Sequence, residues 1–234
     1  MRGLKIVFVV CLVLGVLFVA ADRVAVFIAE GKAADRIQAR QGLEGSTEVS
    51  IHGFPFLTQI YDKHLDDVDV RMTGIRAEPA AAGTGERLMI SEFKVELSGV
   101  ELDGDYGGAT AESAEGSAVI AYEALTAVAG QQGVTFAYGG DGKVQVTASA
   151  EALGAPEPAE VLSTVASEGG DTIRLHAEEV PDTGVPGTEE AVRGAVDIDR
   201  KVGGLPDGVR LDLVTATADG IVVDVEGEGI RVAG

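Results

Sequence analysis

Residues 53–59 of the chain read Gly-Phe-Pro-Phe-Leu-Thr-Gln, which places two aromatic residues where a strand has just ended. The preceding residues 46–52 alternate β-branched and polar side chains, the period of a half-buried strand. Gly53 and Pro55 interrupt that pattern, because proline lacks a donor N–H and biases the residue before it toward extended geometry. The sequence therefore predicts a corner whose aromatic side chains are held against an apolar surface, either in a core or at the lip of an apolar cavity.

Further alternating segments follow this corner, and they predict about nine strands in all. In residues 88–102 the apolar parity changes after Ser98-Gly99, as a β-bulge would cause, so this strand is expected to bend. A second helix is expected over residues 118–128. Many strands with only two or three helices indicate an α+β fold, in which one long, curved antiparallel sheet wraps around a helix. No long linker divides the chain, so residues 22–234 are expected to form a single domain.

The N-terminus has the layout of an export signal. Arg2 and Lys5 precede a run from Ile6 to Ala21 that carries no charge. The sequence leaves two outcomes open for residues 1–21, a signal peptide removed before Asp22 or a signal anchor that is retained as a transmembrane helix. In both cases the rest of the chain lies outside the cytoplasm, in the cell envelope or a periplasm-like space, anchored to or associated with the membrane.

Residues 22–40 predict an amphipathic helix, since charged residues interleave with a narrow apolar stripe at helical spacing. Packing of this stripe on the sheet is the expected arrangement. The alternative is a helix that lies on the membrane or closes a lipid cavity. The residues of the stripe are Val24, Phe27, Ile28, Gly31 and Ala34.

The composition excludes some partners. A formal charge of −20 argues against nucleic acid, which requires clustered Lys and Arg, and against a polybasic grip on anionic headgroups. The histidines His52, His64 and His176 lack the spacing of a metal site, and we find no motif for a nucleophile or a phosphate loop. The sequence thus predicts no catalytic residue, no metal and no cofactor, in a chain that is not an enzyme.

The 53–59 run, a later Leu-Pro-Asp-Gly-Val at 205–209 and Asp219-Gly220 before the last strands carry a resemblance to a known family. With its apolar N-terminal segment, the chain resembles the actinobacterial phospholipid-binding family of the mycobacterial lipomannan elongation factor A (LmeA-like). The resemblance implies the tubular lipid-binding fold of the bactericidal/permeability-increasing protein type (BPI-like, TULIP-like). It also implies a phospholipid partner, of the phosphatidylinositol type, and a role in lipoglycan (mannan) assembly.

If the chain binds lipid, acyl chains must supply most of the affinity, because burying each methylene is worth about 0.8 kcal/mol. The candidate lipid-binding residues are the larger side chains at the corner and on the inward faces of the following strands. For each of them, packing in a solid core is the competing interpretation. They are Phe54, Phe56, Leu57, Ile60, Val70, Met72, Phe93, Val95 and Leu97.

Two rival functions remain open from the sequence. One is an envelope enzyme that acts on a lipid-linked glycan through carboxylates at the mouth of the cavity. The other is a structural envelope protein whose apolar faces make only a core and bind nothing.

Overall fold

A computed structural model describes residues 2–41, 45–77, 88–104, 106–128, 133–153, 157–180, 188–202 and 205–232. Within these ranges the chain forms five helices and eleven strands, two strands more than the sequence pattern predicts. The helices are α1 (Arg2–Gln41), α2 (Phe56–Asp62), α3 (Tyr122–Val128), α4 (Ala150–Leu153) and α5 (Thr188–Val196). The strands are β1 (Thr47–Ile51), β2 (His64–Ala77), β3 (Leu88–Leu102), β4 (Ala109–Ile120), β5 (Val134–Gly140), β6 (Lys143–Ala148), β7 (Ala159–Glu168), β8 (Thr172–Glu179), β9 (Ile198–Lys201), β10 (Val209–Thr217) and β11 (Gly220–Val232).

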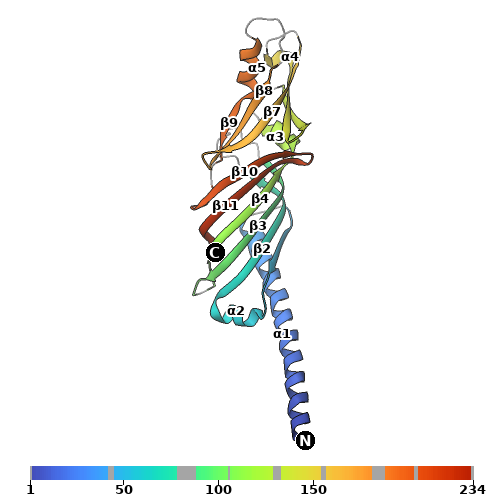
Figure 1. Cartoon of the computed structure of the whole chain (residues 1–234), viewed down its shortest axis with the longest axis vertical. Coiled ribbons are helices and arrows are strands. Elements are labelled where there is room, and N and C mark those ends of the chain that lie inside the picture. The colour runs from blue at the N-terminus through green and yellow to red at the C-terminus, as the bar shows by residue number, and fades with distance from the viewer. Residues whose placement is uncertain are drawn as a thin grey trace.

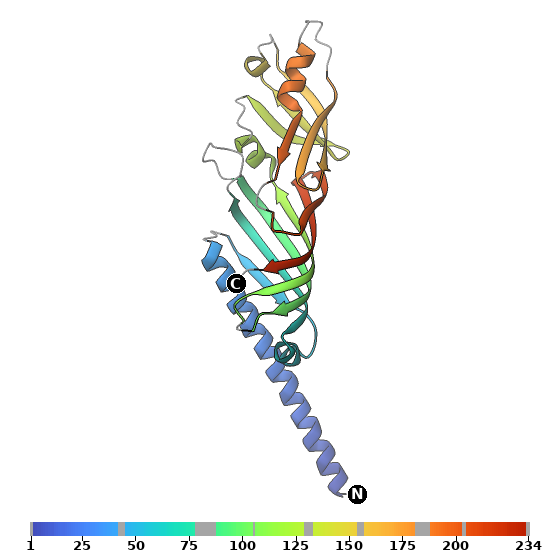
Figure 2. The same cartoon turned by 90° about the vertical axis from the view of Figure 1, so that its left-hand side faces the viewer.

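The strands make two antiparallel sheets. The larger has the order β1-β2-β3-β4-β11-β10, and the smaller has the order β5-β6-β7-β8-β9. The smaller sheet lies at the end of the elongated molecule that is opposite the N-terminus (Figure 1). The larger sheet is curved, and the first half of α1 projects beyond it (Figure 2). The predicted α+β class, with a long curved antiparallel sheet and an apolar N-terminal helix, is confirmed, with the strands divided between two sheets.

Each sheet has its own core. The first core lies on the larger sheet and includes Val26 of α1, Phe56 of α2 and inward residues of β2 and β3. The second core is built by β5 to β8 and α5, together with the ends of β10 and β11. Tyr122 at the start of α3 joins this second core, and its hydroxyl donates a hydrogen bond to the Thr217 carbonyl at 2.8 Å. The long strands β10 and β11 thus connect the two cores, because Val209 and Ile230 belong to the first.

One break in the pairing runs in line across four neighbouring strands of the larger sheet, β2, β3, β4 and β11. On both sides of the break the strands keep the same register, since Leu65 pairs with Val100 and Val68 pairs with Leu97. At the break each strand changes its apolar parity, so that residues three apart are both buried. The parity change predicted after Ser98-Gly99 is confirmed, but no β-bulge lies there, because the neighbouring strands break at the matching residue and the register is unchanged. We call this line of aligned breaks the crease. The residues at the crease are Asp66, Gly99, Glu112 and Gly229.

The crease gives a prediction at Gly99, whose φ is +60°, a conformation that costs an L-residue about 1–2 kcal/mol. A Cβ at Gly99 would also lie 2.9 Å from the Cβ of Glu112. We expect Gly99→Ala to lower the free energy of unfolding by more than Gly229→Ala, a matched control with φ +62° and open space around its Cβ. Thermal unfolding followed by circular dichroism measures both, and equal losses would contradict a close approach at Gly99.

The predicted packing of the α1 stripe is wrong. Val24, Phe27 and Ile28 are exposed, and Phe27 retains 76% of its accessible surface. The face that packs on the first core consists mostly of alanines, namely Ala25, Val26, Ala29, Ala33, Ala34 and Ile37. Small side chains let the helix backbone approach the sheet closely, so α1 lies beside the edge strand β1 (Figure 2). Of the predicted stripe, only Ala34 contacts the core.

The additional strands lie where the sequence has few large apolar residues. Strand β4 reads Ala-Thr-Ala-Glu-Ser-Ala-Glu-Gly-Ser-Ala-Val-Ile, and its inward positions Ala111 and Ala114 are small. Residues 118–120 pair with β3 and β11, so the helix expected over 118–128 begins only at Tyr122. Strand β7 falls in the Ala- and Glu-rich stretch after residue 150, where the sequence shows no motif.

Candidate functional site

The structure brings most of the predicted lipid-binding residues together on the inner face of the larger sheet. Val70 of β2 pairs with Val95 of β3, and Met72 pairs with Phe93. Val70, Met72 and Leu97 are buried, whereas Phe93 and Val95 are half-buried. We call these residues, together with Phe56 and Ile60 of α2, the inner-face cluster. All of them belong to the first core, in which their side chains form one apolar cluster.

The two phenylalanines of the corner, both predicted to bind lipid, differ in burial. Phe56 is 4% exposed and packs in the first core, whereas Phe54 is 58% exposed. Leu57 is also exposed, at 37%. Two of the nine predicted residues therefore lie outside the inner-face cluster, and the assignment of all nine to a lipid site stays a prediction.

Helix α2 continues the corner and is bound to the sheet by one buried side chain. The Gln59 amide donates to the His52 carbonyl at 3.3 Å and accepts from the Asp66 backbone N–H at 3.0 Å. Asp66 is the crease residue of β2, so Gln59 satisfies an amide that the break leaves without a ladder partner. The left-handed residue Lys63 then ends α2 and returns the chain to β2.

Asp22 of α1 fastens the corner to the N-terminal helix. Its side chain is fully buried, and Oδ1 accepts a hydrogen bond from the Leu57 N–H at 2.8 Å. Pro55, at the N-cap of α2, makes no side-chain capping bond, so Asp22 supplies the cap from 35 residues away. A carboxylate at this end also complements the helix dipole.

Arg23 completes this contact. Its guanidinium donates to the Asp22 carboxylate and, at 3.5 Å, to the Gly53 carbonyl. It also lies over the Phe54 ring, 5.3 Å from the centroid, which is within the range of a cation–π contact. Asp22 and Arg23, with residues 53–57, form what we call the corner latch. Hydrophobic periodicity does not reveal this role, and its one sequence signal is a pair of adjacent opposite charges, Asp22 and Arg23, between apolar segments of one helix.

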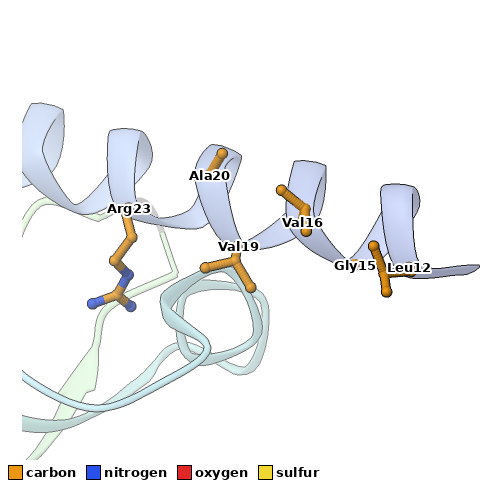
Figure 3. Close-up of a pocket in the computed structure, with 6 residues that line it drawn as sticks. All are labelled: Leu12, Gly15, Val16, Val19, Ala20 and Arg23. Atoms are coloured by element: carbon orange, nitrogen blue, oxygen red, sulfur yellow. The ribbon is translucent and has the colours of Figure 1, made fainter.

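An open hollow of about 510 Å³ runs along α1 next to the corner latch. Figure 3 shows its lining on one side of the helix, with Val19 and Arg23 directed toward the loop that carries α2. The lining is apolar apart from Arg23, and none of the nine predicted residues belongs to it. The lining residues are Leu12, Gly15, Val16, Val19, Ala20 and Arg23.

Within the ranges that the structure describes, no group of three His, Cys, Asp or Glu side chains is arranged to hold a metal ion. A polar group near the corner contacts another side chain of the sheet: His52 Nε2 lies 2.8 Å from an Asp69 carboxylate oxygen on the neighbouring strand. The arrangement is therefore described best by its apolar surfaces.

Helix α1 is long and apolar enough to cross a membrane, by length and composition, and its apolar window is not buried by the rest of the chain. An apolar N-terminal helix fastened to a curved antiparallel sheet with an apolar inner face is consistent with a curved-sheet lipid-binding fold. The chain belongs to the LmeA-like phospholipid-binding family, whose model matches residues 20–226. No curated protein and no solved structure matches the chain. Family membership confirms the resemblance drawn from the 53–59 run and supports phospholipid as the ligand class.

Proposed function

We propose that this protein is an exported, membrane-anchored and non-enzymatic phospholipid carrier or scaffold that holds acyl chains against the inner-face cluster. The observation that carries the proposal is an apolar cluster on the inner face of the sheet in a chain of a phospholipid-binding family, made by Val70, Met72, Phe93, Val95 and Leu97. One sixteen-carbon chain carries roughly 12 kcal/mol of transfer free energy, so an apolar enclosure can bind lipid without a basic headgroup site. That route suits a chain of net charge −20.

Retention of the N-terminal segment is part of the proposal. Helix α1 runs without interruption from Arg2 to Gln41, and Asp22 and Arg23 lie within it. Removal of residues 1–21 would place a new helix end at Asp22, with unpaired backbone N–H groups beside the carboxylate that caps α2. The contacts of the corner latch are therefore better preserved in an anchored chain.

The cellular role follows from the family resemblance. A phosphatidylinositol-type lipid as ligand, and support of lipoglycan (mannan) assembly in an actinobacterial-type envelope, are the finer parts of the proposal. They rest on the 53–59 and 205–209 runs and on family membership.

Photocrosslinking tests the lipid site. The full-length chain is reconstituted in phosphatidylethanolamine and phosphatidylglycerol vesicles that contain a phospholipid with a diazirine near the end of one acyl chain. After irradiation, we expect crosslinks to peptides of β2 and β3 that include Val70, Met72 and Val95. Mass spectrometry of the digested protein locates them.

Two variants of β3 make this test specific. Val95→Asp puts a carboxylate on the half-buried inner face, where desolvation beside an acyl chain is costly, and should reduce these crosslinks severalfold. Lys94→Asp introduces the same residue on the exposed outer face and should leave them unchanged. Crosslinks confined to α1 and the corner would overturn the proposal and favour a protein whose inner-face cluster is only a core.

A further inference from the structure

The environment of α1 changes abruptly at Asp22. From Leu4 to Ala21 the side chains are exposed and contact no core, whereas Ala25 and Val26 pack on the larger sheet. If the first part of the helix lies in a bilayer, the body of the protein begins immediately where the helix leaves the hydrocarbon. The structure therefore places a defined set of residues at the membrane surface.

The corner occupies this position and cannot move independently of α1. The Asp22 bond to the Leu57 N–H and the contacts of Arg23 with Gly53 and Phe54 hold it against the helix at the point of exit. Behind it, Phe56 is buried in the first core. The depth of the corner relative to the anchor is thus fixed by five residues that lie in two separate parts of the sequence.

The outward side chains of the corner are apolar or aromatic. Phe54 and Leu57 are exposed, and Tyr61 on the next turn of α2 is 86% exposed. Aromatic side chains with a polar tip are favoured at the boundary between headgroups and acyl chains. The hydroxyl of Thr58, which shares the outer side of α2, is satisfied by the Pro55 carbonyl at 2.7 Å. In water this surface would expose large apolar groups without a partner.

The length of the anchor supports the same placement. At 1.5 Å per residue, the uncharged run Ile6–Ala21 spans about 24 Å, short of a hydrocarbon core of about 30 Å. The exposed residues Val24, Phe27 and Ile28 would extend the apolar length of α1 to about 34 Å. The two charges inside that length are paired with each other, and Asp22 also accepts a hydrogen bond from the Leu57 N–H at the start of α2. Immersion of the corner would therefore relieve a mismatch between anchor and bilayer at little electrostatic cost.

We propose that Phe54, Leu57 and Tyr61, with the exposed α1 residues Val24, Phe27 and Ile28, form a docking surface that is immersed in the headgroup region of the bilayer around the exit of α1. The exposed carboxylate of Asp62 at the end of α2 disfavours deeper immersion of this surface. The body of the protein is then held at one height and orientation on the membrane. This inference rests on the retained anchor proposed above and is independent of whether lipid enters the inner face.

The absence of tryptophan from the chain allows a direct test, because one introduced Trp reports one position. Full-length single-Trp variants are reconstituted in three kinds of phosphatidylethanolamine and phosphatidylglycerol vesicles. The acyl chains carry no bromine, bromine close to the headgroup, or bromine near the chain ends, which is the depth of Leu14 in an inserted anchor. Bromine quenches a Trp that lies at its depth. The variants are Tyr61→Trp on the corner, Leu14→Trp in the anchor, Tyr138→Trp on β5 and Phe93→Trp on the inner face.

We expect brominated lipid to reduce the emission of Tyr61→Trp severalfold more than that of Tyr138→Trp, which lies on the distal sheet (Figure 1). Leu14→Trp should be quenched as well if the anchor is inserted. Quenching of Tyr61→Trp without quenching of Phe93→Trp supports docking and counts against lipid on the inner face. The reverse pattern overturns docking and supports the lipid site. Docking is also overturned if Leu14→Trp is not quenched by bromine near the chain ends. It is overturned as well if Tyr61→Trp emits equally with no bromine and with bromine close to the headgroup.

Discussion

Phe56→Ala is expected to lower the free energy of unfolding by about 3–5 kcal/mol, the usual cost of removing a buried phenylalanine. Phe56 is 4% exposed and begins α2 inside the first core, where it lies with Leu65 and Val68. Its truncation leaves a cavity, because the corner is held in place by Asp22 and Gln59 and cannot collapse into the space. Chemical unfolding of the full-length chain in detergent micelles, followed by circular dichroism, measures the loss.

The neighbouring Phe54→Ala is the matched control, since it removes the same atoms two residues away. Phe54 is exposed and its principal contact is with the Arg23 guanidinium, so we expect a loss of about 1 kcal/mol or less. Similar losses for the two variants would contradict the split of the two phenylalanines between core and surface.

Asp22→Ala is expected to lower the free energy of unfolding by about 1–3 kcal/mol, because it leaves the Leu57 N–H without its acceptor and removes the carboxylate partner of the Arg23 guanidinium. The effect should be local, so hydrogen exchange at the first turn of α2 should accelerate more than exchange in β3. Mass spectrometry of exchanged peptides in micelles resolves the two regions.

Two controls separate the cap from the charge of Asp22. Asp22→Asn keeps an oxygen that can accept from Leu57 and should retain most of the protection of α2. Asp35→Ala removes a carboxylate from an exposed position of the same helix and should change neither stability nor exchange appreciably. If Asp22→Asn exposed α2 as fully as Asp22→Ala does, the ion pair with Arg23 would be the dominant contact.

The sequence predicts the strands that carry large β-branched side chains and fails where inward positions are small. Strand β3 and its bend are predicted because Phe93, Val95 and Leu97 alternate and the parity then changes. Strand β4 lies between β3 and β11, where alanine and glycine suffice to fill the inward positions. Alanine favours helix locally, so the pairing of β4 is a tertiary effect that single-sequence periodicity does not register.

Hydrophobicity predicts which face of α1 avoids water, but it cannot distinguish burial in the protein from contact with another apolar environment. Val24, Phe27 and Ile28 are large apolar side chains that remain exposed, whereas the face that packs on the sheet consists mostly of alanines. Close packing of a helix on an edge strand selects small residues, and the larger ones remain outside. In the proposed docking surface, these residues meet lipid.

The corner was predicted from local sequence, whereas its attachment was not. The 53–59 run indicates a turn with buried aromatic residues, and Phe56 is buried. The split between Phe54 and Phe56 depends on Asp22 and Arg23, which are more than 30 residues away along the chain. A contact between two distant segments does not change the periodicity of hydrophobic residues in either segment. Its one sequence signal is the placement of two charges between apolar segments of a helix.

The crease has a mechanical consequence for the larger sheet. Because the four breaks are aligned and the ladder keeps one register on both sides, the two parts of the sheet can tilt relative to each other without slippage of any strand pair. Gly99 and Gly229, both at positive φ, occupy two of the four positions on this line. The angle at which the two parts of the sheet meet along this line therefore depends on backbone torsions at only one residue of each strand.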